Sequence, residues 1–143
     1  MSNEHQLIQG NLFSDDRGSL SFMNDFSLKA IVRFYEIKPK DSTIIRAWQA
    51  HKNESKWFYC TQGSFKVNLI KLDSFENPSD NLTVFSYKLN ANNPQVLFIP
   101  GGYANGFRAT SEDSKLIVFS DFDIEASKLD DFRFETNKWI NKW

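Results

Sequence analysis

One short stretch, IRAWQAHKNESKWFYCTQG at residues 45–63, carries several side chains that are suited to chemistry. It holds His51, one of two histidines in the chain, together with Gln49 and Lys56. An imidazole with an ordinary pKa near ~6.5 exchanges protons at neutral pH. An ammonium group stabilises a developing oxyanion or binds a phosphate. The stretch therefore permits acid–base chemistry, although a lone histidine in a half-buried strand is more often a hydrogen-bonded structural residue.

The segments around these residues have the pattern of β-strands. They are short and rich in β-branched and aromatic residues, and Gly, Pro, Asn and Asp separate them, which is typical of strands joined by turns. Gly63 in TQGS predicts a tight hairpin, and only residues 123–139 have helical character. We expect an all-β sandwich or barrel whose body is residues 29–122. The expected strands lie within residues 29–37, 42–51, 55–61, 64–73, 81–90, 95–100 and 115–122.

Length, charge and cysteine content limit the classes of protein. A chain of 143 residues predicts a single domain over residues 1–143. The net charge of −1 gives no long-range attraction to nucleic acid or to an anionic membrane, so a phosphate ligand needs local cations. Cys60 is the only cysteine, which excludes an internal disulfide. Because no signal-like or membrane-spanning apolar run is present, we expect a cytoplasmic protein.

Strand alternation predicts which side chains share a face. Gln49 and His51 point the same way, whereas Arg46 lies on the opposite face unless an irregularity turns the strand. On the next strand Lys56 shares a face with the apolar positions, and Tyr59 lies on the other face. The sequence therefore predicts that Gln49 and His51 lie on the same face of their strand.

Two segments resemble a known family. RAWQAHK (46–52) is similar to the pattern Arg-Gly-x-His-x-His-Lys of dTDP-sugar 3,4-ketoisomerases, and IPGGYANGF (99–107) is similar to the pattern Ile-Pro-x-Gly-Phe-x-His-Gly-Phe of dTDP-4-dehydrorhamnose 3,5-epimerases. Both groups belong to the cupin branch, and DDRGSLSF (15–22) also resembles them. The resemblance covers roughly residues 10–135. It implies a cupin-type double-stranded β-helix, also called a jelly-roll barrel.

The resemblance also implies a homodimer. The aromatic-rich segments 22–26 and 29–37 are expected to be strands whose outer faces need cover. Contact near the N-terminus is the expected mode of association.

The resemblance does not extend to a metal site. Metal-binding cupins supply three histidines and a glutamate, because a divalent ion needs several nitrogen and oxygen donors. This chain has Gln49, His51, Lys56 and Asn105 at the corresponding positions, and the ammonium of Lys56 repels a cation. We therefore expect neither a metal nor another cofactor.

The catalytic residues that the resemblance implies are partly replaced. The base histidine of the epimerases corresponds to Gln49, and their acid tyrosine corresponds to Phe122. Neither replacement exchanges protons. The ketoisomerase pattern loses only the first of its two histidines, so His51 stays the candidate base. Lys56 matches a lysine that lies near the substrate, and Arg46 matches an arginine that contacts the ligand.

Other candidate substrate contacts each have an alternative role. Tyr35 and Tyr59 contact a nucleotide sugar or simply pack in the core. Gln49 contacts substrate or fixes the tautomer of His51, and Asn105 contacts substrate or holds its turn. The charged run DDFRFETNK at residues 130–138 predicts a solvated surface or part of a dimer contact.

Three functions follow from these residues. The first is isomerisation or epimerisation of a dTDP-4-keto-6-deoxyhexose in surface-polysaccharide biosynthesis, closer to a 3,4-ketoisomerase than to a 3,5-epimerase. The second is a non-catalytic cupin module that binds a sugar or sugar nucleotide, and the third is a structural partner of a sugar-modifying enzyme. The combination of Arg46, His51 and Lys56 favours the first, whereas Gln49, Phe122 and Asn105 favour the second.

Overall fold

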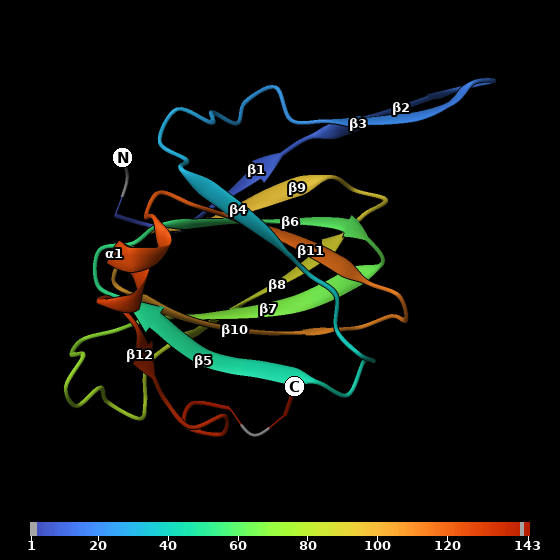
Figure 1. Cartoon of the computed structure of the whole chain (residues 1–143). Coiled ribbons are helices and arrows are strands. Elements are labelled where there is room, and N and C mark those ends of the chain that lie inside the picture. The colour runs from blue at the N-terminus through green and yellow to red at the C-terminus, as the bar shows by residue number, and fades with distance from the viewer. Residues whose placement is uncertain (1–2, 141) are drawn as a thin grey trace.

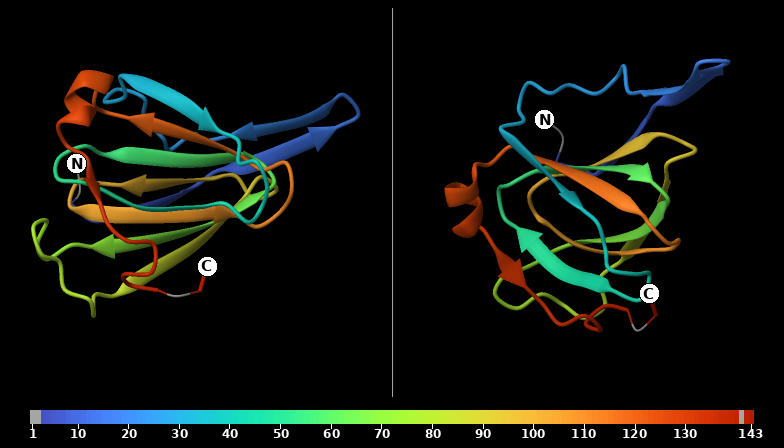
Figure 2. Two further views of the ribbon diagram at one scale, coloured as in Figure 1. Left: turned by 60° about the horizontal axis from the view of Figure 1, so that its bottom comes forward. Right: turned by 45° about the vertical axis from the view of Figure 1, so that its right-hand side comes forward.

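Two antiparallel five-stranded sheets face each other in the computed structural model, which describes residues 3–140 and 142–143 (Figures 1 and 2). The prediction of an all-β chain is confirmed, because the described residues contain one short helix. In chain order the elements are β1 (Gln6–Gln9), β2 (Asn11–Asp15), β3 (Gly18–Phe22), β4 (Arg33–Ile37), β5 (Ile45–His51), β6 (Lys56–Gln62), β7 (Ser64–Lys71), β8 (Val84–Asn90), β9 (Gln95–Ile99), β10 (Tyr103–Ala109), β11 (Lys115–Ser120), α1 (Ile124–Lys128) and β12 (Phe132–Arg133).

The strand order brings distant segments together. One sheet has the order β1-β9-β6-β11-β4, and the other has the order β12-β5-β10-β7-β8. The side chains that face each other between the sheets form the main core, which includes Phe58, Phe65, Leu97 and Val118. β4 is an edge strand of the first sheet, and β5 lies next to the short edge strand β12 in the second. The functional site opens between β4 and β5.

A tight turn is present at TQGS, but the hairpin prediction is wrong, because β6 pairs with β9 and β11 in the first sheet whereas β7 pairs with β8 and β10 in the second. β6 and β7 meet at Gly63, whose φ of 69° lies in the region that glycine adopts without a steric cost. The strands expected at residues 22–26 and 29–32 are not formed, since β3 ends at Phe22 and β4 begins at Arg33. The connecting segment instead packs Phe26 and Ile31 against Trp57 on the outer face of the first sheet.

The segment that follows α1 covers the outer face of the second sheet. β12 pairs with the edge of β5, with Phe132 opposite Ala50. Trp48 is 1% exposed, and Trp139 and Trp143 contact it from the C-terminal segment. Within the described residues, no helix has the length and apolar character needed to cross a membrane.

Candidate functional site

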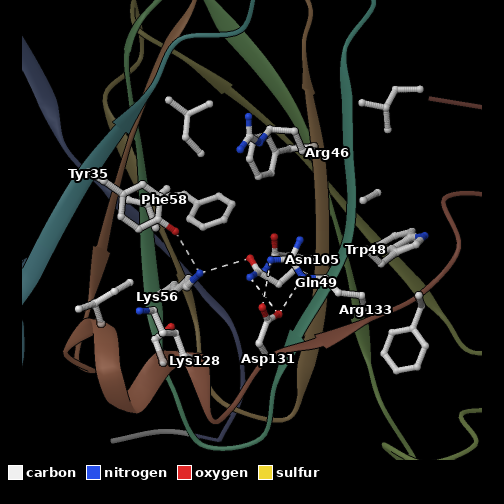
Figure 3. Close-up of a pocket in the computed structure, with 18 of the residues that line it drawn as sticks. Tyr35, Arg46, Trp48, Gln49, Lys56, Phe58, Asn105, Lys128, Asp131 and Arg133 are labelled. Atoms are coloured by element: carbon white, nitrogen blue, oxygen red, sulfur yellow. Dashed lines mark hydrogen bonds and ion pairs between the residues drawn. The ribbon is translucent and has the colours of Figure 1, made fainter.

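A pocket of about 640 Å³ opens between the two sheets, at the edge formed by β4, β5, α1 and β12. Figure 3 shows most of its lining. Phe58, Phe107 and Val118 form the apolar part, where the pocket meets the core. Polar side chains from β4, β5, β6 and β12 occupy the rest of the wall. Such a combination of an apolar floor and converging polar groups is typical of small-molecule sites.

A chain of polar contacts crosses the pocket (Figure 3). Lys56 Nζ donates to Tyr35 Oη at 3.0 Å and to Gln49 Oε1 at 3.4 Å. Gln49 Nε2 donates to Asp131 Oδ1 at 3.2 Å, and Arg133 donates to both carboxylate oxygens of Asp131 at 2.8 and 3.1 Å. The amide of Gln49 therefore links the cation on β6 to the carboxylate beside β12.

A bulge in β5 turns Arg46 into the pocket. Asn105 lies opposite Gln49 and Phe107 lies opposite Arg46, so two β5 residues occupy the space opposite Gly106. The extra residue shifts the alternation by one position. Arg46 consequently lines the pocket with Gln49, while Trp48 lies on the other side of the strand (Figure 3).

The pocket is strongly cationic for a chain whose net charge is −1. Among the described residues that line it, one is acidic, Asp131, and five carry a positive charge: Arg33, Arg46, Lys56, Lys128 and Arg133. The Arg133 guanidinium holds the pKa of Asp131 below its usual range, mainly through their hydrogen bonds. Clustered cations in a partly enclosed site attract an anionic ligand.

His51 lies at the end of β5 with 3% exposure, and it is not part of the pocket lining. Its Nδ1 contacts the backbone oxygen of Asp130 at 2.6 Å. Because a carbonyl only accepts, Nδ1 carries the hydrogen and Nε2 has the free lone pair. Nε2 is buried and has no hydrogen-bond partner among the described residues. Burial, and then the charge of Lys56, lowers the pKa of His51, which favours the neutral imidazole.

The structure brings together most of the residues that the sequence nominated. Tyr35, Arg46, Gln49, Lys56 and Asn105 all line the pocket. Asn105 is in β10 rather than in a turn, and it faces the pocket with 4% exposure.

Tyr59 is separated from this group. It packs on the outer face of β6 with Trp57 and Phe98, as strand alternation requires. We therefore do not propose it as a ligand contact.

Several pocket residues were missed from the sequence. Asp131 and Arg133 belong to the charged run that predicted a solvated surface, but β12 brings them to the pocket mouth. Arg33 shares a strand face with Tyr35, so alternation along β4 contains a signal for it. Lys128 lies in the last turn of α1, and no local pattern predicts where that helix packs.

The pocket residues suit an anion better than a cation. Within residues 3–140 and 142–143, no three His, Cys, Asp or Glu side chains gather in the way that a metal ion needs. The oxygen of Gln49 already accepts from the Lys56 ammonium. The absence of a metal nevertheless stays a prediction that elemental analysis has to test.

A comparison with protein-family models matches residues 3–131 to the dTDP-4-dehydrorhamnose 3,5-epimerase family. The chain is a member of this family. A search of curated proteins finds no match. The family is one of dTDP-sugar epimerases and isomerases, as the resemblance of the two sequence segments predicts.

Solved structures of related enzymes share the fold of this epimerase-family chain. A dTDP-4-dehydrorhamnose 3,5-epimerase from Bacillus anthracis, with TDP and pyrophosphate bound, has a TM-score of 0.74 at 20% identity, over 94% of this chain and 80% of that one. A sugar 3,4-ketoisomerase from Thermoanaerobacterium thermosaccharolyticum, in complex with TDP, has a TM-score of 0.71 at 21% identity, over 96% and 93%. A TDP-quinovose 3,4-ketoisomerase from Campylobacter jejuni has a TM-score of 0.68 at 22% identity, over 93% and 95%. The cupin-type jelly roll is thereby confirmed.

Proposed function

We propose that this member of the epimerase family binds a dTDP-linked 4-keto-6-deoxyhexose and isomerises or epimerises it at C3, more as a 3,4-ketoisomerase than as a 3,5-epimerase. The observation that carries the proposal is the pocket whose lining includes five cations, one of which, Lys56, contacts Tyr35. The diphosphate supplies the negative charge that such a pocket attracts, and the TDP and pyrophosphate in the Bacillus anthracis relative support this choice.

The pocket residues have separate tasks in this proposal. Arg46 holds the diphosphate, because a guanidinium donates two parallel hydrogen bonds to phosphate oxygens. Arg33 adds positive charge nearby, since its Nε and Nη2 already donate within the protein. Lys56 stabilises the negative charge on the sugar oxygen when the carbon next to the ketone loses its proton. Tyr35 Oη, held 3.0 Å from that ammonium, lies where it can exchange a proton with the same oxygen.

His51 is the proposed base. Its Nε2 takes the proton from C3, and the C3–H electron pair forms an enolate with the negative charge on O4. For isomerisation the hydroxyl proton of O3 passes to O4 and the imidazolium returns its proton to C4, which leaves the ketone at C3. Epimerisation at C3 requires in addition a second group that delivers a proton to the opposite face of C3. A single base acting on one face is sufficient for the 1,2-shift. A full 3,5-epimerisation needs an acid and a base on opposite faces, and Gln49 occupies the position of the family's base. Surface-polysaccharide synthesis in the cytoplasm is the setting we propose.

Deuterium exchange provides the direct test. The protein is incubated with dTDP-4-keto-6-deoxyglucose in D₂O, and the sugar is followed by NMR. Exchange at C3 without exchange at C5 is the expected result. His51→Asn should abolish this exchange and leave the affinity for dTDP nearly unchanged, because the base acts on the transition state. Equal exchange rates in wild type and His51→Asn would remove His51 as the base.

A binding module without catalysis is the second candidate function. It is favoured by the position of His51 outside the pocket lining and by the unreactive amide of Gln49. Thermal unfolding with and without dTDP separates this function from a structural role, since a ligand at a hundred times its Kd adds about 2.7 kcal/mol to the stability of the fold. Stabilisation without deuterium exchange supports the binding module. No stabilisation and no exchange leaves a structural role.

A further inference from the structure

Glu54 is a fully buried carboxylate in the loop between β5 and β6. Ser120 Oγ donates to its Oε2 at 2.5 Å, and Ser127 Oγ donates to its Oε1 at 2.6 Å. Arg33 Nη2 adds an ion pair at 3.3 Å. Burial of a carboxylate is costly unless such donors satisfy it. β4, β11 and α1 each supply one of them, so three separate elements hold this group in place.

The carboxylate of Glu54 lies beside the imidazole of His51. Its Oε1 is 3.4 Å from His51 Nδ1. The only other acidic residue in contact with that ring nitrogen, among the described residues, is Asp130, and it contributes its backbone oxygen. The carboxylate of Asp130 accepts instead from the backbone N–H groups of residues 52, 53 and 54, at 2.7, 2.9 and 2.8 Å.

The two acidic residues therefore have different relations to the imidazole. The Asp130 carbonyl fixes the orientation of the ring and places the hydrogen on Nδ1. A neutral carbonyl stabilises an imidazolium less than a carboxylate does, because hydrogen bonds between ionised partners are stronger. The carboxylate of Glu54 lies next to Nδ1, whereas the carboxylate of Asp130 accepts hydrogen bonds from the loop backbone.

We propose that Glu54 is a positioning residue for His51, with a carboxylate that stabilises the imidazolium formed when Nε2 takes up a proton. The inference rests on the proposed function, in which that proton comes from the sugar carbon next to the ketone. In this step the C–H bond breaks, an N–H bond forms at Nε2, and the electron pair moves to the sugar oxygen. Nδ1 keeps its hydrogen throughout and donates it to the Asp130 carbonyl, with Glu54 Oε1 3.4 Å away.

The charges around the ring oppose one another. Lys56 on β6 disfavours the imidazolium, while Glu54 and Asp130 favour it. Asp131 next to β12 is the further charged group that interacts with His51. If Glu54 loses its charge, less negative charge offsets the repulsion between Lys56 and the imidazolium, and the ring becomes harder to protonate.

Titration of His51 in Glu54→Gln tests this relation without any measurement of activity. The substitution removes the charge and keeps the shape. Glu36→Gln is the matched control, since Glu36 is exposed on the outer face of β4. With two histidines in the chain, a His5→Gln variant assigns the two imidazole signals in nitrogen-detected NMR spectra. We expect Glu54→Gln to lower the pKa of His51 by about one unit or more and to leave the hydrogen of the neutral ring on Nδ1. Glu36→Gln should leave the pKa of His51 unchanged. An unchanged titration midpoint would overturn the proposal.

Wild-type protein provides a second measurement in case Glu54→Gln fails to fold. With carbon-13 in the glutamate carboxyl groups, the Glu54 signal should shift with the same midpoint as the His51 ring, and the Glu36 signal should not. A Glu54 chemical shift that stays constant while His51 titrates would also overturn the proposal. Deuterium exchange in D₂O reports on the proposed function separately. Its absence in wild type removes the reaction, whereas the NMR titrations decide whether Glu54 supports the charge of the ring.

Discussion

Lys56 is the cation at the centre of the hydrogen-bond network in the pocket. Lys56 is 4% exposed, and its ammonium is directed at the Tyr35 hydroxyl and the Gln49 amide. Both partners are neutral, so the charge of Lys56 stays available for a ligand oxygen. A cation held in this way contributes to substrate binding and to stabilisation of the enediolate alike.

Lys56→Met should therefore weaken both binding and proton exchange. Loss of a charge-assisted hydrogen bond costs about 1.5–3 kcal/mol, which corresponds to roughly a 10- to 100-fold loss of affinity for dTDP-4-keto-6-deoxyglucose. Calorimetry measures the binding, and NMR in D₂O measures the exchange. The exposed Lys88 on β8 offers the control Lys88→Met, and equal losses in the two variants would contradict the assignment.

His51 predicts how stability depends on pH. Burial lowers its pKa in the folded protein below the ordinary value of 6.5. As the pH falls below about 6.5, the unfolded chain gains a proton that the folded chain does not bind, so the free energy of unfolding decreases by up to ~1.4 kcal/mol per pH unit. The decrease should continue until the pH reaches the folded pKa.

Urea denaturation between pH 7.5 and 5 measures this effect. The comparison uses a His5→Gln background, because burial lowers the pKa of His5 in the same direction. Adding His51→Asn should flatten the profile. A slope that does not change on this substitution would mean that His51 is not the residue that titrates.

At the level of elements, the bulge in β5 decides which side chains enter the pocket. It depends on Gly106 in β10, because a Cβ at this position would lie 2.6 Å from the Cβ of Ala47 and 2.5 Å from the Trp143 ring. Only a residue without a side chain leaves room for the extra β5 residue at this point.

Gly106→Ala should destabilise the fold by about 1–3 kcal/mol, as over-packing of a core does. It should also weaken dTDP binding, because Arg46 and Asn105 lie on the strands that must separate. Thermal unfolding and calorimetry measure the two effects. Full retention of both properties would show that the bulge tolerates a side chain.

The same elements show what the sequence can predict. Alternation correctly puts Lys56 and Tyr59 on opposite faces of β6, because it depends only on neighbouring residues in one strand. The position of Arg46 depends on the residue opposite the bulge, and a single strand does not contain that information. Asp131 and Arg133 depend on the pairing of β12 with β5, which is a contact between segments about eighty residues apart. Contacts of this kind also bring Glu54 and Asp130 to His51.

For the whole molecule, apolar surface predicts association. The β2–β3 hairpin projects from the body (Figure 1), and it exposes Phe13 and Leu20. On the outer side of β4, Phe34 is 68% exposed and Val32 is also exposed. Scattered apolar residues are ordinary on a surface, but aromatic side chains on a hairpin without tertiary cover suit an interface.

We accordingly propose a homodimer that covers this surface. Light scattering should give a mass near twice 16.6 kDa at micromolar concentration. Phe34→Asp should shift the equilibrium to the monomer, because it places an unpaired charge in the interface. A wild-type mass of one chain would contradict the proposal.

Metal content is the second property of the whole molecule that we predict. Purified protein should contain no metal in stoichiometric amount, and a chelator should change neither its melting temperature nor its deuterium exchange. The reason is the set of groups at the pocket, in which Gln49 and Asn105 are the neutral donors and Lys56 adds a positive charge. Elemental analysis that finds one metal ion per chain would overturn this prediction.

β12 has a consequence for the way the protein is made. Residues 130–133 are synthesised after all the strands that they contact. A nascent chain that lacks them leaves one edge of β5 unpaired and the indole of Trp48 without its cover. Bare strand edges with exposed aromatic residues associate with one another. Premature termination near residue 129 should therefore yield an aggregating chain rather than a partly active one.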